Sequence, residues 1–123
     1  MNTLPALDLE IFQEMQDAVA QQPTAVAALY GTFLGNATRL IATLGMAESA
    51  TTREKTLHTL KGSAAMMGAA RMARLAADLQ SSCATMPAQA MQAAIGELEA
   101  ELDAIQRAID AHLDAGGYRG SST

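Results

Sequence analysis

The amino-acid sequence predicts an all-α protein built as a single domain, and three observations support this class. Half of the 123 residues are hydrophobic, yet there is no Trp and there are only two Phe and two Tyr, so Ala, Leu, Met and Ile must fill most of the core. Apolar residues recur at spacings of three and four, and no run of alternating β-branched residues indicates a strand. A chain of this length can bury a core without a disulfide or a structural metal.

Two helices are predicted in the N-terminal part of the chain. Asp8 can cap the free backbone N–H groups of a helix that runs toward Gln21 and ends before Pro23, with an apolar face made of Phe12, Met15 and Val19. A second helix is expected from about Thr24 to Gly45, a typical stop residue. Its apolar face has the spacing of an amphipathic helix and consists of Val26, Leu29, Phe33, Ala37, Leu40 and Leu44.

Three further helices are predicted toward the C-terminus. Thr51 and Glu54 have the spacing of a capping box at the start of a third helix, which Gly68 ends. A fourth helix is expected to follow, with a core-facing side made of Met72, Leu75, Leu79 and Cys83. Pro87 starts a long fifth helix with a bundle-type repeat of Met91, Ile95, Leu98, Leu102, Ile105 and Ile109. Short loops between these helices favour packing within one chain over a dimeric coiled coil, so we expect a monomer.

Composition divides the chain into an N-terminal extension at 1–7, the helical domain at 8–115, and a small, polar, glycine-rich tail at 116–123 that is typical of a flexible segment. No apolar run approaches the length of a membrane span, and no basic segment followed by an apolar one marks the N-terminus. We therefore expect a cytoplasmic protein without direct membrane contact. The lone Cys83 excludes an internal disulfide and is expected in the core.

Charge is distributed unevenly along the chain. The formal net charge of -5 argues against a nucleic-acid-binding protein. The segment from Arg53 to Arg74 nevertheless holds five basic residues and the single acid Glu54, a local charge of +4. This basic charge is expected to gather around His58 and to favour an acidic partner.

His58 is expected to face solvent from the third helix. Rotation of about 100° per residue places a core stripe of Leu57, Leu60, Ala64 and Met67 on one side, and places His58 on nearly the opposite side with Glu54, Lys55, Lys61, Gly62 and Ala65. An exposed imidazole keeps a nucleophilic ring nitrogen available near neutral pH. A metal site would need further ligands, and only Glu54 is near; a hydrolase would need an orienting acid and an oxyanion site, which this face lacks.

The same face has what is needed to dock a partner and to hold a phosphoryl group. A glycine inside a helix costs about 1 kcal/mol relative to alanine, and Gly62 is explained if another protein must approach His58 closely. Lys61 can offset part of a phosphoryl charge on His58, and Lys55, Ala65 and Met66 are candidates for the docking surface. Elsewhere, we expect most methionines, including Met66 and Met67, to be core filler rather than a cofactor site, with Met66 at the border of the docking surface. We expect the Ser63 hydroxyl to bond back to a helix carbonyl, and His112 to lie on the surface near the end of the last helix.

The segment HTLKGSAAMMGAARMARLAADLQ at 58–80 resembles the signature of histidine-containing phosphotransfer (HPt) domains of bacterial multistep phosphorelays. That pattern has a histidine, one variable position, Leu-Lys-Gly-Ser and then a small segment ending in Gly-Ala, filled here by His58, Leu60, Lys61, Gly62, Ser63, Gly68 and Ala69. Two departures are Leu57, where alanine is common, and Met72, where leucine is usual. The resemblance covers residues 8 to 115.

The resemblance implies an antiparallel four-helix bundle with a short additional N-terminal helix, and a phosphorylatable His58 that reacts through Nε2. It implies response-regulator receiver domains and a hybrid sensor histidine kinase as partners, no cofactor of the chain's own, and Mg²⁺ on the partner receiver. Such domains occur alone and as terminal domains of membrane-bound hybrid kinases. No phosphate-binding loop ending in GK[ST] is present, so we expect no ATP-dependent kinase activity.

Two alternatives remain open. The first is a helical adaptor that docks a signalling partner through the same face without being phosphorylated. The second is the dimerisation and phosphoacceptor region of a histidine kinase, which is disfavoured because Thr59 follows His58 where kinases commonly have an acid.

Overall fold

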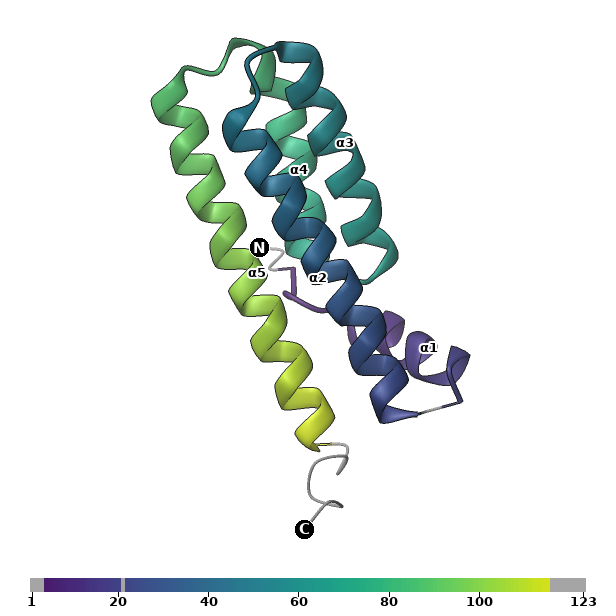
Figure 1. The fold of residues 1–123 in the computed structure, drawn as a ribbon. Coiled ribbons are helices and arrows are strands. Elements are labelled where there is room, and N and C mark those ends of the chain that lie inside the picture. Colours follow the sequence, from purple (N-terminus) through teal and green to yellow (C-terminus); the bar gives the residue numbers. More distant parts are fainter. Residues whose placement is uncertain (1–3, 21, 116–123) are drawn as a thin grey trace.

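The computed structural model describes residues 4–20 and 22–115, and all regular secondary structure in these residues is helical (Figure 1). A short 3-10 helix, η1 (Cys83–Thr85), joins the last two of five α-helices, which are α1 (Leu9–Ala18), α2 (Pro23–Met46), α3 (Ala50–Met66), α4 (Ala70–Ser82) and α5 (Ala88–Ala115). The predicted all-α class is therefore confirmed.

Four of the helices form an antiparallel bundle, in which α2 packs against α3 and α5, and α4 packs against the same two helices (Figure 1). At 1.5 Å per residue, α2 is about 10 Å longer than α3, and α5 is longer still. The short helix α1 lies at the end of the bundle where α2 and α5 extend beyond the α3–α4 turn. The structure thus has the bundle and the additional N-terminal helix that the resemblance implies.

The core lies between the helices and follows the predicted apolar faces closely. All four residues of the α3 stripe are buried, and the largest fully buried side chains are Tyr30, Phe12, Leu44, Leu57, Leu60, Met72, Leu98 and Ile105. Cys83 is buried as expected, and burial raises the pKa of its thiol. Ile95 and Leu102 are only half-buried because they line a groove between α2 and α5.

The boundaries of the first two helices lie close to the predicted ones. Asp8 caps α1 as predicted, and its Oδ1 accepts hydrogen bonds from the backbone N–H groups of Glu10 at 2.9 Å and Ile11 at 3.3 Å. α1 ends at Ala18, earlier than predicted, and Ala20 then adopts a positive φ of 55°. The predicted stop at Gly45 is one residue short, because α2 continues to Met46.

The capping box predicted at the start of α3 is wrong. Ser49, not Thr51, is the N-cap, and its Oγ accepts a hydrogen bond from the backbone N–H of Thr52 at 3.1 Å. Thr51 lies inside the helix, one residue after its start at Ala50. Ser is a somewhat better N-cap residue than Thr, and the turn that leaves α2 places Ser49 at the start of the helix.

The α3–α4 turn is built on Gly68, which has a φ of +80°. A Cβ at this position would lie 3.0 Å from Cβ of Ile11, and the Gly68 carbonyl accepts a hydrogen bond from the Asp8 N–H at 2.7 Å. The buried Tyr30 hydroxyl donates to the Met67 carbonyl at 3.0 Å. The turn is thus held by α1 on one side and by α2 on the other.

The N-terminal extension is packed rather than separate where the structure describes it. Leu7 is buried in the core, and the Pro5 carbonyl accepts a hydrogen bond from the Arg71 N–H at 3.2 Å. The predicted flexible tail at 116–123 lies outside the described residues.

The surface position predicted for His112 is also wrong. Its ring is half-buried and packs edge-to-face against Phe12, with ring centroids 4.6 Å apart and an interplanar angle of 88°. Phe12 in turn contacts Tyr30 at a centroid distance of 5.2 Å. His112 therefore helps to hold α1 against α5, a contact between distant segments that local periodicity does not reveal.

Candidate functional site

His58 lies midway along α3 and faces away from the bundle core. Thr56 and Leu57, the two preceding residues, are 7% and 0% exposed, whereas His58 and Thr59 are both exposed. The imidazole makes no hydrogen bond, ion pair or ring contact with any residue that the structure describes. A ring nitrogen is consequently free to react with a group that another molecule brings to it.

The surface next to His58 is open because the residue one turn after it, Gly62, has no side chain. Gly62 is exposed, and a Cβ built on it would meet nothing within 4 Å. Ala65, one turn further on, is exposed as well. Packing inside the bundle therefore does not require a glycine at 62.

Two lysines flank His58 on α3. Lys55 is exposed one turn before it, and Lys61 is half-buried one turn after it. Neither lysine has an ion-pair partner in the described part of the chain. Their charges are therefore available to anionic groups that approach the histidine.

The other basic residues of the segment do not gather around His58 as expected. Arg71 Nε lies 3.1 Å from Glu101 Oε1 on α5, and Arg74 Nε lies 3.4 Å from Asp78 Oδ1 one turn along α4. Both residues belong to α4 and not to the helix of the histidine, so their closeness in sequence does not place them on its face.

Arg53 belongs to α3 but bonds toward the interior. Its Nη1 donates to the carbonyls of Cys83 at 3.1 Å and Met86 at 3.0 Å, which holds the α4–α5 connection against α3. Arg53 thus has a structural role. Of the five basic residues in the segment, Lys55 and Lys61 are the two that lie on α3 within one turn of His58 and have no ion-pair partner among the described residues.

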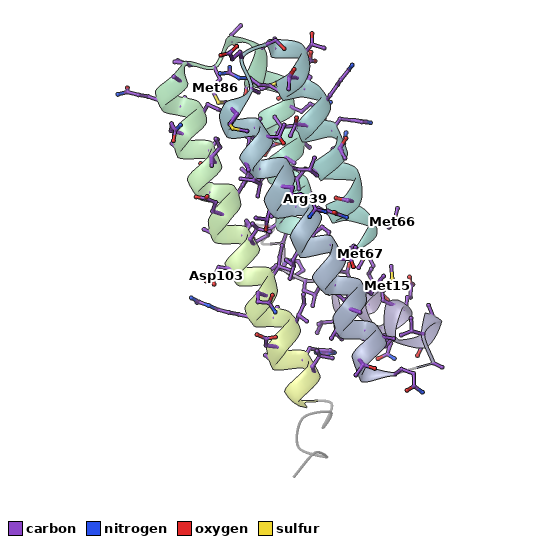
Figure 2. The ribbon with its side chains drawn as sticks, viewed as in Figure 1. Met15, Arg39, Met66, Met67, Met86 and Asp103 are labelled. Carbon is purple, nitrogen blue, oxygen red and sulfur yellow. The ribbon has the colours of Figure 1, made fainter. Side chains whose placement is uncertain are left out.

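Two neighbouring methionines at the end of α3 differ in their exposure to solvent. Met67 is 7% exposed and belongs to the core, as predicted. Met66 is 69% exposed, so the expectation that it fills the core is wrong (Figure 2). Met66 instead extends the surface that begins at Gly62 and Ala65. The Ser63 Oγ donates to the Leu60 carbonyl at 3.3 Å, the back-bond that was expected.

Gln80 on α4 is a site candidate that the sequence interpretation missed. Arg71 pairs with Glu101 of α5, so Arg71 lies on the side of α4 that faces α5. Gln80 comes nine residues later, which corresponds to a rotation of about 180° around the axis of α4. Gln80 therefore lies on the side of α4 that faces α3. Counting from the Gly68 turn places Gln80 within about 3 Å of the level of His58 along the bundle. Its half-buried side-chain amide has no hydrogen bond in the described structure. The antiparallel register around Gly68 was the signal that could have found it.

The described residues include no group of three or more His, Cys, Asp or Glu side chains that could hold a metal ion. In the same part of the chain, no helix is long and apolar enough to cross a lipid bilayer.

The described residues define a class of protein, a helical bundle that carries an exposed, unpaired histidine beside an open surface. The family model of the Hpt domain matches residues 9–108. The chain therefore belongs to the Hpt domain family, which acts by histidine phosphotransfer in two-component phosphorelays and interacts with receiver domains. Comparison with curated proteins and with solved structures gave no significant match.

Proposed function

We propose that His58 is the phosphoacceptor, which receives a phosphoryl group from the aspartyl phosphate of a response-regulator receiver domain and passes it to the aspartate of another receiver. The observation that carries this proposal is the exposed imidazole without an internal partner, beside the open surface at Gly62. Membership of the Hpt domain family supports the same chemistry.

The proposed step exchanges one bond for another at phosphorus. The lone pair of a ring nitrogen of His58, Nε2 by family resemblance, forms the N–P bond while the P–O bond to the receiver aspartate breaks and that aspartate leaves as a carboxylate. The reverse step regenerates the free imidazole. Positioning and charge neutralisation dominate such transfers, so a small helical module can act without a catalytic cleft.

Charge neutralisation is divided between the two proteins in this proposal. Lys61 lies one turn from His58 and offsets part of the phosphoryl charge, while the side-chain amide of Gln80 is placed to donate a hydrogen bond to a phosphoryl oxygen. Mg²⁺ is assigned to the partner receiver. Phosphoryl transfer then needs no cofactor bound to this chain.

Docking is proposed to follow the exposed side of α3. Lys55 faces acidic groups of the receiver, Gly62 lets its active-site loops approach, and Ala65 and Met66 form an apolar contact. An exposed lysine at the edge of an interface contributes about 0.2–1 kcal/mol, so loss of Lys55 should weaken transfer by no more than about fivefold. Removal of Lys61 should weaken it further, because that charge lies beside the phosphoryl group.

The proposal places the protein in the cytoplasm as a monomer, with a hybrid sensor histidine kinase as the source of phosphoryl groups. It acts either as a separate protein or as the terminal domain of such a kinase. It does not phosphorylate itself from ATP.

The test is transfer of radioactive phosphate from phosphorylated receivers of the source organism. The protein should acquire acid-labile, alkali-stable label, and His58→Gln should abolish it. His112→Gln is the matched control, because it removes the other histidine of the chain and should keep the label. Undiminished labelling of His58→Gln would show that the site is wrong, and binding of a receiver without any labelling would favour the adaptor instead.

A further inference from the structure

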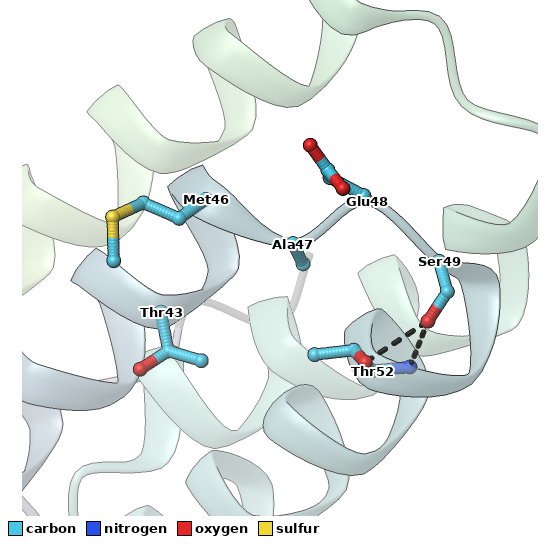
Figure 3. Close-up of a pocket in the computed structure, with 6 residues that line it drawn as sticks. All are labelled: Thr43, Met46, Ala47, Glu48, Ser49 and Thr52. Carbon is cyan, nitrogen blue, oxygen red and sulfur yellow. Dashed lines mark hydrogen bonds between the residues drawn. The ribbon is translucent and has the colours of Figure 1, made fainter.

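A second surface feature lies where α2 turns into α3, and the proposed transfer makes no use of it. A shallow pocket of about 420 Å³ opens there, lined by Thr43, Met46, Ala47, Glu48, Ser49 and Thr52 (Figure 3). Thr43 and Met46 project from the end of α2, and Ser49 and Thr52 come from the start of α3, with Glu48 on the connecting turn. All of these side chains except Ala47 are exposed.

The pocket carries a negative charge and an apolar wall. Glu48 has no hydrogen bond or ion pair in the described structure. Ser49 Oγ donates to Thr52 Oγ1 at 2.9 Å, which holds these two hydroxyls together at one side of the pocket. Met46 is 78% exposed and provides a flexible apolar side. A carboxylate beside an apolar wall suits a lysine or arginine, whose aliphatic stem packs while its charged head stays at the carboxylate.

A partner that covers His58 also reaches this pocket. Thr52 and His58 are six residues apart, which is about 9 Å along α3 and about 120° around it, or about 15 Å across the helix surface. A standard protein interface buries about 800 Å² on each partner, equivalent to a disc of about 16 Å radius. The side of the pocket nearest His58, at Thr52, therefore falls at the edge of an interface centred on His58, with Lys55 between the two, and Glu48 lies one turn further from the centre.

Resting on the proposed function, we infer that this pocket is a second docking point, which receives a lysine or arginine side chain of the receiver. Charge complementarity selects this occupant, because Glu48 is the charged group of the pocket and lies at the opposite end of the docking face from Met66. Lys55 and Lys61 lie between them and attract acidic groups. A single carboxylate and three hydroxyls offer too few strong ligands for a tightly bound metal ion.

The order of charges from Glu48 to Lys61 favours one orientation of the docked partner. A receiver in the productive orientation places a basic side chain at Glu48 and acidic groups at the lysines. A receiver turned end for end moves its basic side chain to the Met66 end of the docking face and loses the contact with Glu48, which weakens binding. Glu48 thus orients the partner and selects among receivers that share the same active-site chemistry.

The experiment uses the receiver that transfers phosphate to this protein fastest in a profile of the source organism's receivers. Glu48→Gln should lower kcat/KM for transfer about two- to fivefold at low salt, through KM, and Glu48→Lys should lower it further. Both effects should shrink as salt is raised. Glu99→Gln is the matched control, since Glu99 is an exposed acid that lines the groove on the other flank of α2, between α2 and α5. It should transfer at the wild-type rate.

The outcomes separate this inference from the function on which it rests. Wild-type transfer by both Glu48 variants, with labelling still lost in His58→Gln, would overturn the docking point and leave the phosphoacceptor in place. The same result with chemical-shift changes at Glu48 on addition of free arginine would assign the pocket to a small cation. Absence of labelling by every receiver would overturn the function and the docking point together.

Discussion

Gly62 offers a substitution that should raise the stability of the protein while lowering its activity. The residue lies inside α3, does not have the positive φ that favours glycine, and has no atom within 4 Å of a built Cβ. The bundle therefore gains from a side chain at this position. The cost of a larger residue should be felt only when a receiver docks beside His58.

The expected magnitudes follow from helix propensity and from packing. Gly62→Ala should increase the free energy of unfolding by about 1 kcal/mol, and Gly62→Gln by about half as much. For a domain of this size, 1 kcal/mol corresponds to a rise in Tm of about 3–6 °C. A bulky side chain inserted into a packed contact costs about 1–3 kcal/mol, so Gly62→Gln should slow transfer about fivefold or more.

Stability is measured by urea unfolding followed by circular dichroism, and transfer by the appearance of label on His58 at limiting receiver. Gly96 on α5 is the matched control, because it is also an exposed helical glycine with nothing within 4 Å of a built Cβ. Gly96→Gln should show a similar gain in stability and unchanged transfer.

Two results would refute this reasoning. Transfer by Gly62→Gln at the wild-type rate would mean that the receiver does not approach over this surface. A loss of stability in Gly62→Ala would mean that α3 needs the glycine for its own conformation, and steric access would then not explain it.

Two further predictions concern the turn between α3 and α4 and the buried tyrosine that bonds to it. Gly68→Ala should destabilise the fold by at least about 2 kcal/mol in urea unfolding, because it combines a positive φ with a Cβ 3.0 Å from Cβ of Ile11; wild-type stability would show that the turn can relax. Burial, and to a smaller extent the Asp8 carboxylate, raises the pKa of Tyr30 to about 12. The folded state therefore holds the phenol proton more tightly than the unfolded chain, so the contribution of Tyr30 to stability should be constant below about pH 10 and fall by up to about 3 kcal/mol as the pH rises to 12. In urea unfolding between pH 8 and 12, Tyr30→Phe should lose this part of the decline and keep the part due to the buried Cys83 thiol, whose pKa is also raised; an equal decline in both proteins would contradict the assignment.

The parts of the fold that the sequence predicted well are those governed by neighbours within one helix. The stripe of Leu57, Leu60, Ala64 and Met67 is buried in full, and His58 is exposed on the other side. Helix geometry relates residues three and four apart without reference to the rest of the chain. Periodicity therefore separated core from surface on α3 before any packing was known.

The errors concern choices that depend on other helices. Ser49 and Thr51 can each cap a helix in isolation, and the turn after α2 places the first of them at the start of α3. His112 is a polar residue near a helix end, yet Phe12 of α1 covers it. Arg53 is close to His58 in sequence, but the carbonyls of the α4–α5 connection take its guanidinium.

The candidate site shows the same division. The exposed histidine, the small residues after it and Lys61 could be predicted from one segment of α3, and the resemblance to HPt domains depends on the same segment. Gln80 and the Glu48 pocket required the antiparallel register of α4 and the turn from α2. Residues from different helices become neighbours only after the helices pack.

The sequence by itself determined the helices, their buried faces and the histidine that faces solvent, because backbone geometry within a helix repeats regardless of context. The tertiary structure decided which of the basic side chains remain unpaired on the helix of that histidine, and where the pocket that contains Glu48 opens between α2 and α3. These features depend on distances between segments remote in the chain, which are set by the simultaneous packing of α2, α3, α4 and α5 around one core.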